Sequence, residues 1–223
     1  MERHFHEQLE TLRKRLLEMA GLAEQAIAQT LEALVQRDDA LAQAVVDADE
    51  AIDRLEVQVD ELCLRLLATQ QPMAVDLRFI TSAMKINNDL ERIGDHAVNI
   101  AQYTRVLNQS QPLGLAQHLP HMAAVARAMV GESLRCFVTG DADGAKALCQ
   151  RDDEVDRMDA ELTRKFISSM MADATAVERA LHLTLISKNL ERIADLATNI
   201  AEEVVFIVQA QSVKHQTPPP PRG

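Results

Sequence analysis

Apolar residues recur at steps of three and four along almost the whole chain, which is the period of an α-helix. The first predicted helix is followed by a turn at residues 37–39, where Asp38 or Asp39 can cap the second helix. The second helix should stop before Pro72, because the residue before a proline disfavours the helical region. A third helix is predicted over residues 73–107. The apolar stripes of these three helices are Leu9, Leu12, Leu16, Met19, Ala23, Ala26, Thr30 and Ala33; then Leu41, Val45, Ile52, Leu55, Val59, Leu62 and Leu66; then Leu77, Ile80, Met84, Ile86, Leu90, Ile93, Ala97, Ile100 and Leu107.

The polar segment 108–114 contains Pro112 and Gly114 and is the best candidate for an internal linker. Beyond it the pattern repeats, with helices over about 115–138, from the break at 139–141 to about 171, and from a break near Asp173 to about 210. We therefore predict an all-α protein of two tandem, internally repeated three-helix bundles, with six long helices. The predicted units are residues 1–110, residues 111–212 and a disordered Pro-rich tail at 213–223.

Two segments show that the halves are related by duplication. Residues 90–101 and 190–201 read LERIGDHAVNIA and LERIADLATNIA, and nine of these twelve positions are identical. Residues 49–56 and 152–159 are similar at an offset of 103. Amphipathicity alone would reproduce the Leu and Ile positions, but it would not keep Glu, Arg, Asp and Asn in register. An internal repeat is the better explanation.

Composition limits the classes of function. The net charge of −11 disfavours nucleic acid, whose binding depends on Lys and Arg, and also disfavours direct docking on an anionic membrane. No apolar run approaches the ~20 residues that span a bilayer, and residues 1–6 lack the apolar stretch of a signal peptide. Cys63, Cys136 and Cys149 form no CxxC pair, and we interpret them as buried or partly buried small apolar residues. We expect a cytoplasmic protein.

Acidic residues repeat on one face of each predicted helix pair. Residues four apart lie 40° apart around a helix, so Glu91 and Asp95 share a face, as do Glu191 and Asp195. The preceding helices carry acidic stripes of Asp49, Asp53, Glu56 and Asp60 in the first half and of Asp152, Asp156 and Asp159 in the second. If these helices are neighbours, each half gathers at least four carboxylates.

Two interpretations of the acidic faces remain open. Carboxylate oxygens suit Mg²⁺, Ca²⁺, Mn²⁺ and iron, so each face could hold cations. Alternatively, each face is a solvated surface that Arg54, Arg92, Arg157 and Arg192 neutralise through local ion pairs, since exposed like-charge repulsion costs only about 1 kcal/mol or less.

Other chemistry is not supported. The di-iron oxidases of four-helix bundles use Glu-x-x-His, and none of the seven histidines has a carboxylate three residues before it. His96 adjoins the first motif, but Leu196 replaces it in the second, and we interpret His96 as a helix-surface residue. The chain has no Gly-rich phosphate loop and no GxSxG motif.

The segment from Asn88 to Ala101 resembles the signature of the PhoU family, and the segment from Asn189 to Glu202 resembles that family's repeat. The resemblance covers essentially residues 3–210. Two copies of NxxLERIxDxAxNIA about 100 residues apart are quite specific. The second copy departs from the first at Lys188, which stands in place of Asn88, and at Leu196, so it is the poorer match.

The resemblance implies a function in phosphate uptake. Members of the family are two three-helix bundles, usually homodimeric, which act as accessory proteins of the phosphate-specific ABC transporter. They are negative regulators of the phosphate regulon, and are thought to bridge the transporter's ATPase subunit and a sensor histidine kinase. We therefore expect a non-enzymatic adaptor that reaches the membrane only through protein partners and binds no nucleic acid.

The resemblance also implies a set of metal ligands, because some members carry multinuclear iron or zinc sites on E/DxxxD pairs, while others are metal-free or bind Mg or Mn. Carried over to this chain, the candidates are Asp49, Asp53, Glu91 and Asp95 in the first half and Asp152, Asp156, Glu191 and Asp195 in the second. An alternative of a different class is a metal-binding helical bundle with a storage function or a metal-dependent enzymatic activity.

Overall fold

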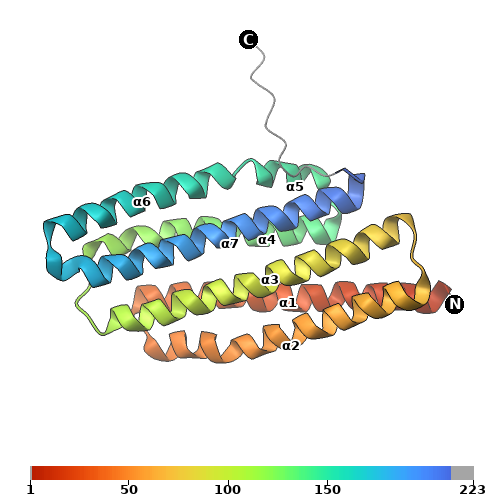
Figure 1. Ribbon diagram of the computed structural model, residues 1–223, viewed down its shortest axis with the longest axis horizontal. Coiled ribbons are helices and arrows are strands. Elements are labelled where there is room, and N and C mark those ends of the chain that lie inside the picture. The colour runs from red at the N-terminus through yellow and green to blue at the C-terminus, as the bar shows by residue number, and fades with distance from the viewer. Residues whose placement is uncertain (1, 212–223) are drawn as a thin grey trace, which may run out of the picture.

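The computed structural model describes residues 2–211 and shows an elongated bundle of helices (Figure 1). The prediction of an all-α protein is confirmed, and residues 2–211 contain no strand. The first half consists of α1 (Glu2–Gln36), α2 (Asp39–Gln70) and α3 (Ala74–Asn108). The second half consists of the 3₁₀ helix η1 (Gly114–His118), α4 (Leu119–Thr139), α5 (Ala142–Cys149), α6 (Asp152–Ala172), the 3₁₀ helix η2 (Ala174–Ala176) and α7 (Val177–Gln209). The predicted tail at 213–223 lies outside the described residues.

The ends of α2 follow the predicted signals. The Asp38 carboxylate accepts hydrogen bonds from the backbone N–H groups of Ala40 and Leu41 at 2.9 and 3.0 Å, which satisfies two donors at the start of the helix. At the other end Gln71 adopts a left-handed conformation with φ of 48°, one residue before Pro72. Both predicted boundaries of α2 are confirmed.

One predicted helix is interrupted. The segment from 142 to about 171 was expected to be continuous, but it divides into α5 and α6 at residues 150–151. Backbone N–H groups of Gln150 and Arg151 bond three residues back, to Ala147 and Leu148, which tightens the last turn of α5. Three acidic residues at 152–154 then favour a new helix N-terminus through the helix dipole. The Arg151 guanidinium holds the break against α4 by donating to Glu132 Oε2 at 2.7 Å.

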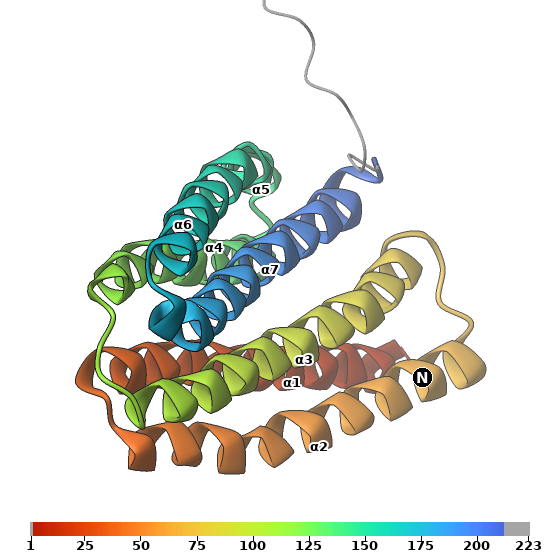
Figure 2. The ribbon, with the colours of Figure 1, turned by 60° about the vertical axis from the view of Figure 1, so that its left-hand side comes forward.

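Four helices lie side by side on one face of the molecule in the order α2, α3, α7, α6, and α1 and α4 pack behind them (Figures 1 and 2). The core lies between these layers, and it buries most of the apolar stripes predicted for the first three helices. Leu77 is an exception, because 41 % of it is exposed near the start of α3. The three cysteines are buried or half-buried, as predicted. Burial raises the pKa of the Cys63 thiol to about 12 and that of Cys149 to about 11, which favours the protonated thiol at neutral pH.

The two halves meet where α3 packs antiparallel to α7, and we call this contact the seam. Near the start of α3, Ser82 Oγ donates to the buried Glu203 carboxylate at 2.8 Å. Near its end, the Tyr103 ring packs against the His182 ring with centroids 5.8 Å apart. Position 82 corresponds to 182 in the repeat, and 103 corresponds to 203. The two contacts therefore join the same pair of repeat positions, with the halves interchanged. The halves are therefore related by an approximate twofold axis through the seam.

None of the helices between residues 2 and 211 is both long and apolar enough to cross a lipid bilayer.

Candidate metal centres

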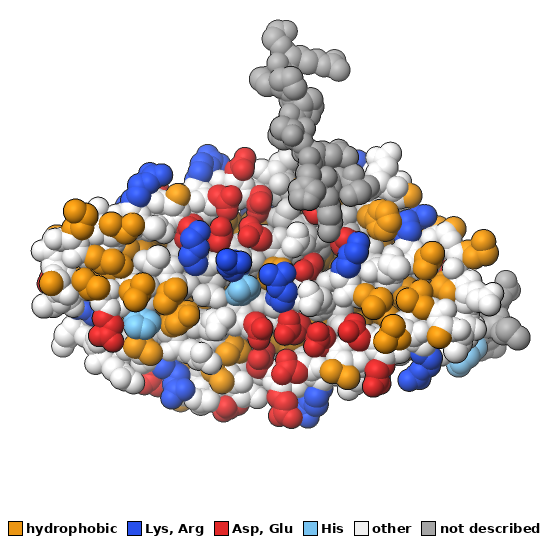
Figure 3. All heavy atoms as spheres, in the orientation of Figure 1, with side chains coloured by type: hydrophobic (Ala, Val, Ile, Leu, Met, Phe, Trp, Pro, Cys, Tyr) orange, Lys and Arg blue, Asp and Glu red, His pale blue; other side chains and the backbone are white. Residues whose placement is uncertain are grey.

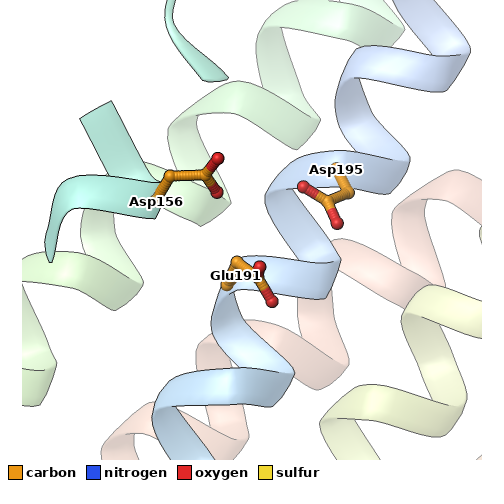
Figure 4. Close-up of side chains that lie close together, drawn as sticks. All are labelled: Asp156, Glu191 and Asp195. Carbon is orange, nitrogen blue, oxygen red and sulfur yellow. The ribbon is translucent and has the colours of Figure 1, made fainter. Parts of the chain in front are cut away.

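The second half gathers three carboxylates in one place. Asp156 points from α6 toward α7, where Glu191 and Asp195 lie one turn apart (Figure 4). One oxygen from each of the three lies within 4.8 Å of the others. Divalent cations bind oxygen at about 2.0–2.6 Å, so oxygens on opposite sides of one ion are separated by about 4–5 Å. The three carboxylates therefore fit a single divalent cation.

Asp152, the fourth candidate in this half, lies one turn before Asp156 on α6. Its Oδ1 accepts a hydrogen bond from Thr198 Oγ1 on α7 at 3.3 Å. Burial, together with the charge of Asp156, raises the pKa of Asp152. Burial also raises the pKa of Asp195 to about 6, with added repulsion from Glu191 and Asp152. All four predicted residues thus belong to one interacting group.

The first half forms a similar group between α2 and α3. Burial raises the pKa of Asp49 to about 6, and the charges of Asp53 and Asp95 add to the shift. Burial raises the pKa of Glu91 to about 7, followed by repulsion from Asp95, Glu56 and the α2 aspartates. The expectation that adjacent helices bring Asp49 and Asp53 to Glu91 and Asp95 is therefore met.

Glu56 also belongs to this first group. Burial raises its pKa, and the charges of Asp60, Asp53 and Asp95 raise it further. The sequence placed Glu56 in the acidic stripe, but the family pattern of paired E/DxxxD residues did not include it. The signal was its position seven residues after Asp49, two turns along the same face.

A small residue on α3 lets the two helices of the first half approach closely. A Cβ atom at Gly94 would lie 2.9 Å from Ile52 Cδ1 and 3.1 Å from Asp49 Oδ1 on α2. At the equivalent positions the second half has Ala194 and Val155, and valine lacks the δ-methyl group of isoleucine. Each half therefore pairs a smaller residue on one helix with a larger one on the other: Gly94 with Ile52, and Ala194 with Val155.

Acidic side chains form two groups on the face of Figure 3, and lysine, arginine and histidine side chains lie between them. We call the group of Asp49, Asp53, Glu56, Glu91 and Asp95 the first cluster, and the group of Asp152, Asp156, Asp159, Glu191 and Asp195 the second cluster.

The four arginines proposed as neutralising partners do not form ion pairs with the candidate ligands. Within the described part of the chain, Arg92 pairs with Asp89 at 3.9 Å. Arg54 and Arg157 donate Nε to backbone carbonyls of their own helices. Arg192 forms no ion pair within 4.0 Å of the eight candidates, although its charge opposes the rise in the pKa of Asp195. Within the described residues, the eight carboxylates are therefore not paired with these arginines within 4.0 Å, and the choice between a cation site and a solvated face stays a prediction.

Lys188, unlike these arginines, forms ion pairs with carboxylates of the second cluster. Its Nζ lies 2.6 Å from Asp159 Oδ2 and 3.5 Å from Glu191 Oε1. Sequence reasoning recorded Lys188 only as a departure from the repeat. Its position three residues before Glu191, on the same helix face, could have indicated the pair.

His96 is not a simple surface residue. It is half-buried in the seam, where its Nδ1 lies 2.8 Å from Asn189 Oδ1 on α7. Burial lowers its pKa, and the charges of Arg192 and Arg92 lower it further. The interpretation of His96 as a helix-surface residue rather than a ligand did not include this contact, because it considered one helix without the other half packed beside it.

The cation-free protein is expected to lose stability as pH rises from about 5 to about 8. Asp49, Glu91 and Asp195 have pKa values of about 6, 7 and 6 in the fold, against ordinary values of 3.8 to 4.5. In this window these three groups bind more protons in the folded chain than in the unfolded chain. Their contribution to stability is therefore full below about pH 4 and is lost as pH passes their folded pKa values. His96 acts in the opposite direction, but it is one group against three. Melting temperatures in EDTA measure the trend. A melting temperature that rises steadily from pH 5 to pH 8 contradicts it.

The fold and the site together define a class: a helical protein of two duplicated lobes, with one acidic cluster in each lobe. The PhoU domain family model matches residues 16–104 and 119–204. The chain belongs to the PhoU family.

Similar proteins cover almost the full length. A Pseudomonas aeruginosa protein named phosphate-specific transport system accessory protein PhoU homolog is 38 % identical over 217 residues, which is 96 % of this chain and 89 % of that protein. A Caulobacter vibrioides protein of the same name is 36 % identical over 215 residues, 96 % and 94 % of the two chains. The crystal structure of PhoU from Pseudomonas aeruginosa superposes with a TM-score of 0.90 at 39 % identity, over 93 % of this chain and all of that one.

Proposed function

We propose that this chain is an accessory protein of a phosphate-specific transport system and a negative regulator of the phosphate regulon and of phosphate uptake. The observation that supports the proposal is similarity along nearly the whole chain to proteins named phosphate-specific transport system accessory protein, and to a PhoU crystal structure with the same fold. Both repeats are included in the match, so the likeness is not limited to one bundle.

The proposed mode of action is a non-enzymatic adaptor in the cytoplasm. The chain, as a homodimer, would contact the ATPase subunit of the phosphate ABC transporter and a sensor histidine kinase. Binding one state of the transporter better than another shifts the population of kinase states, because a partner moves an equilibrium only through differential affinity. The exposed helical face with its two acidic clusters offers a broad surface for such contacts.

We also propose that the two clusters bind divalent cations or iron. The support is geometric: carboxylates from two neighbouring helices converge in each half, and three of them in the second half fit one ion. Asp49, Asp53, Glu91 and Asp95 would hold a cation in the first half, and Asp152, Asp156, Glu191 and Asp195 in the second. A bound cation would neutralise repulsion between the helices of each pair, and so stabilise the packing of α2 on α3 and of α6 on α7.

The regulatory proposal is tested by deleting the gene and measuring a phosphate-regulated phosphatase in cells grown with abundant phosphate. Loss of repression is expected, since the kinase would no longer be held inactive. Re-expression of the chain should restore repression. Unchanged repression in the deletion strain would count against the proposal.

A further inference from the structure

The two clusters carry the same carboxylates but not the same counter-charge. Positions 49, 53, 56, 91 and 95 correspond to 152, 156, 159, 191 and 195, and all ten are Asp or Glu. One position differs: α3 has Asn88 where α7 has Lys188. Asparagine carries no charge, so the ion pairs that Lys188 forms in the second cluster have no counterpart at position 88 in the first.

Lys188 is placed to act on the ligands and not only on solvent. Its Nζ contacts Asp159 Oδ2 at 2.6 Å, and Asp159 is almost fully buried, with Ser187 Oγ donating to its other oxygen at 2.7 Å. The same ammonium lies 3.5 Å from Oε1 of Glu191, which belongs to the three carboxylates that fit one ion. Lys188 therefore bridges Asp159, which is not a candidate ligand, and Glu191, which is one.

We propose that Lys188 is a built-in counter-ion that weakens divalent-cation binding at the second cluster, so that the first cluster binds the cation more tightly. This inference rests on the cation binding proposed above, and assigns unequal affinities to two sites that the duplication made alike.

The size of the effect follows from Coulomb's law. A cation bound to Glu191 Oε1 at about 2.2 Å would lie at most about 6 Å from the Lys188 Nζ. Repulsion between an ammonium and a divalent ion at about 6 Å corresponds to about tenfold in affinity even with the dielectric constant of water. Lys188 also helps to order Glu191, but this contact is long, at 3.5 Å, and the lysine is exposed, so the gain lies at the low end of the range for one side chain, about two- to threefold. The net effect of the lysine is to weaken binding.

The test measures Mn²⁺ dissociation constants by electron paramagnetic resonance and calorimetry on the full chain. The second cluster is measured in an E91Q/D95N background, and the first cluster in an E191Q/D195N background. The first cluster is expected to bind about tenfold more tightly. K188N should tighten the second cluster by about three- to tenfold, and the reciprocal variant N88K should weaken the first by a similar factor. K188R keeps the charge and is the matched control, with no change expected.

Both substituted positions are exposed, so the two variants should fold, and circular dichroism checks this. Equal affinities in the two halves, or no response to both K188N and N88K, would overturn the inference while leaving cation binding intact. Absence of Mn²⁺ binding in the wild type would overturn the inference and the cation part of the proposed function together. The phosphatase experiment would still decide the regulatory part.

Discussion

Replacement of the eight candidate ligands by their amides is expected to weaken Mn²⁺ binding by more than about 100-fold. The affinity of oxygen sites for hard cations follows the number of charged ligands. Amide oxygens keep the shape of the site but remove its charge. The variant is D49N, D53N, E91Q, D95N, D152N, D156N, E191Q and D195N combined, measured by calorimetry at pH 7.5.

The same variant should be more heat-stable than the wild type when no cation is present. The cost of burying charged carboxylates close together, which through burial and then repulsion raises the pKa of Glu91 to about 7, is then absent. The control is E10Q/E18Q/E61Q/E178Q, which removes four exposed charges outside both clusters and should leave Mn²⁺ binding nearly unchanged. Equal losses of binding in the two variants would show that general negative charge, and not the clusters, attracts the ion.

Truncation of Phe166 to alanine is expected to lower the free energy of unfolding by about 3–5 kcal/mol, because it leaves a cavity in a close-packed core. Phe166 lies on α6 and is 0 % exposed. For a chain of this size, a loss of that order lowers the melting temperature by about 10 °C. Urea unfolding followed by circular dichroism measures the change.

The neighbouring residue provides the control for this substitution. Ile167 is 48 % exposed, and I167A should change the free energy of unfolding by less than about 1 kcal/mol. A loss in F166A no larger than that in I167A would contradict the assignment of Phe166 to the core.

Helix positions were predictable because they depend on local signals. The period of apolar residues, the Asp38 cap and Pro72 each act within a few residues, and all three predictions are confirmed. The break between α5 and α6 was missed because no proline or glycine marks it. At the break, Arg151 pairs with Glu132 on α4, and the sequence pattern does not show this contact between helices.

The candidate site was predictable only in part for the same reason. Repeated i, i+4 carboxylates indicated which side chains share a helix face, and the structure brings the faces together in both halves. The ion pair of Lys188 with Asp159 and the contact of His96 with Asn189 depend on which helices are neighbours. The assignment of the eight carboxylates as metal ligands stays a prediction.

The approximate twofold relation across the seam has a consequence for how such a chain can arise. In the seam, Ser82 of the first repeat contacts Glu203 of the second. At the equivalent positions, His182 of the second repeat contacts Tyr103 of the first. A chain with a single repeat would leave that surface of its third helix uncovered, and two such chains could cover each other by C2 symmetry. In this chain the two copies are joined, so the contact is intramolecular. Its two sides need not be identical, and Glu203 and Tyr103 occupy equivalent places.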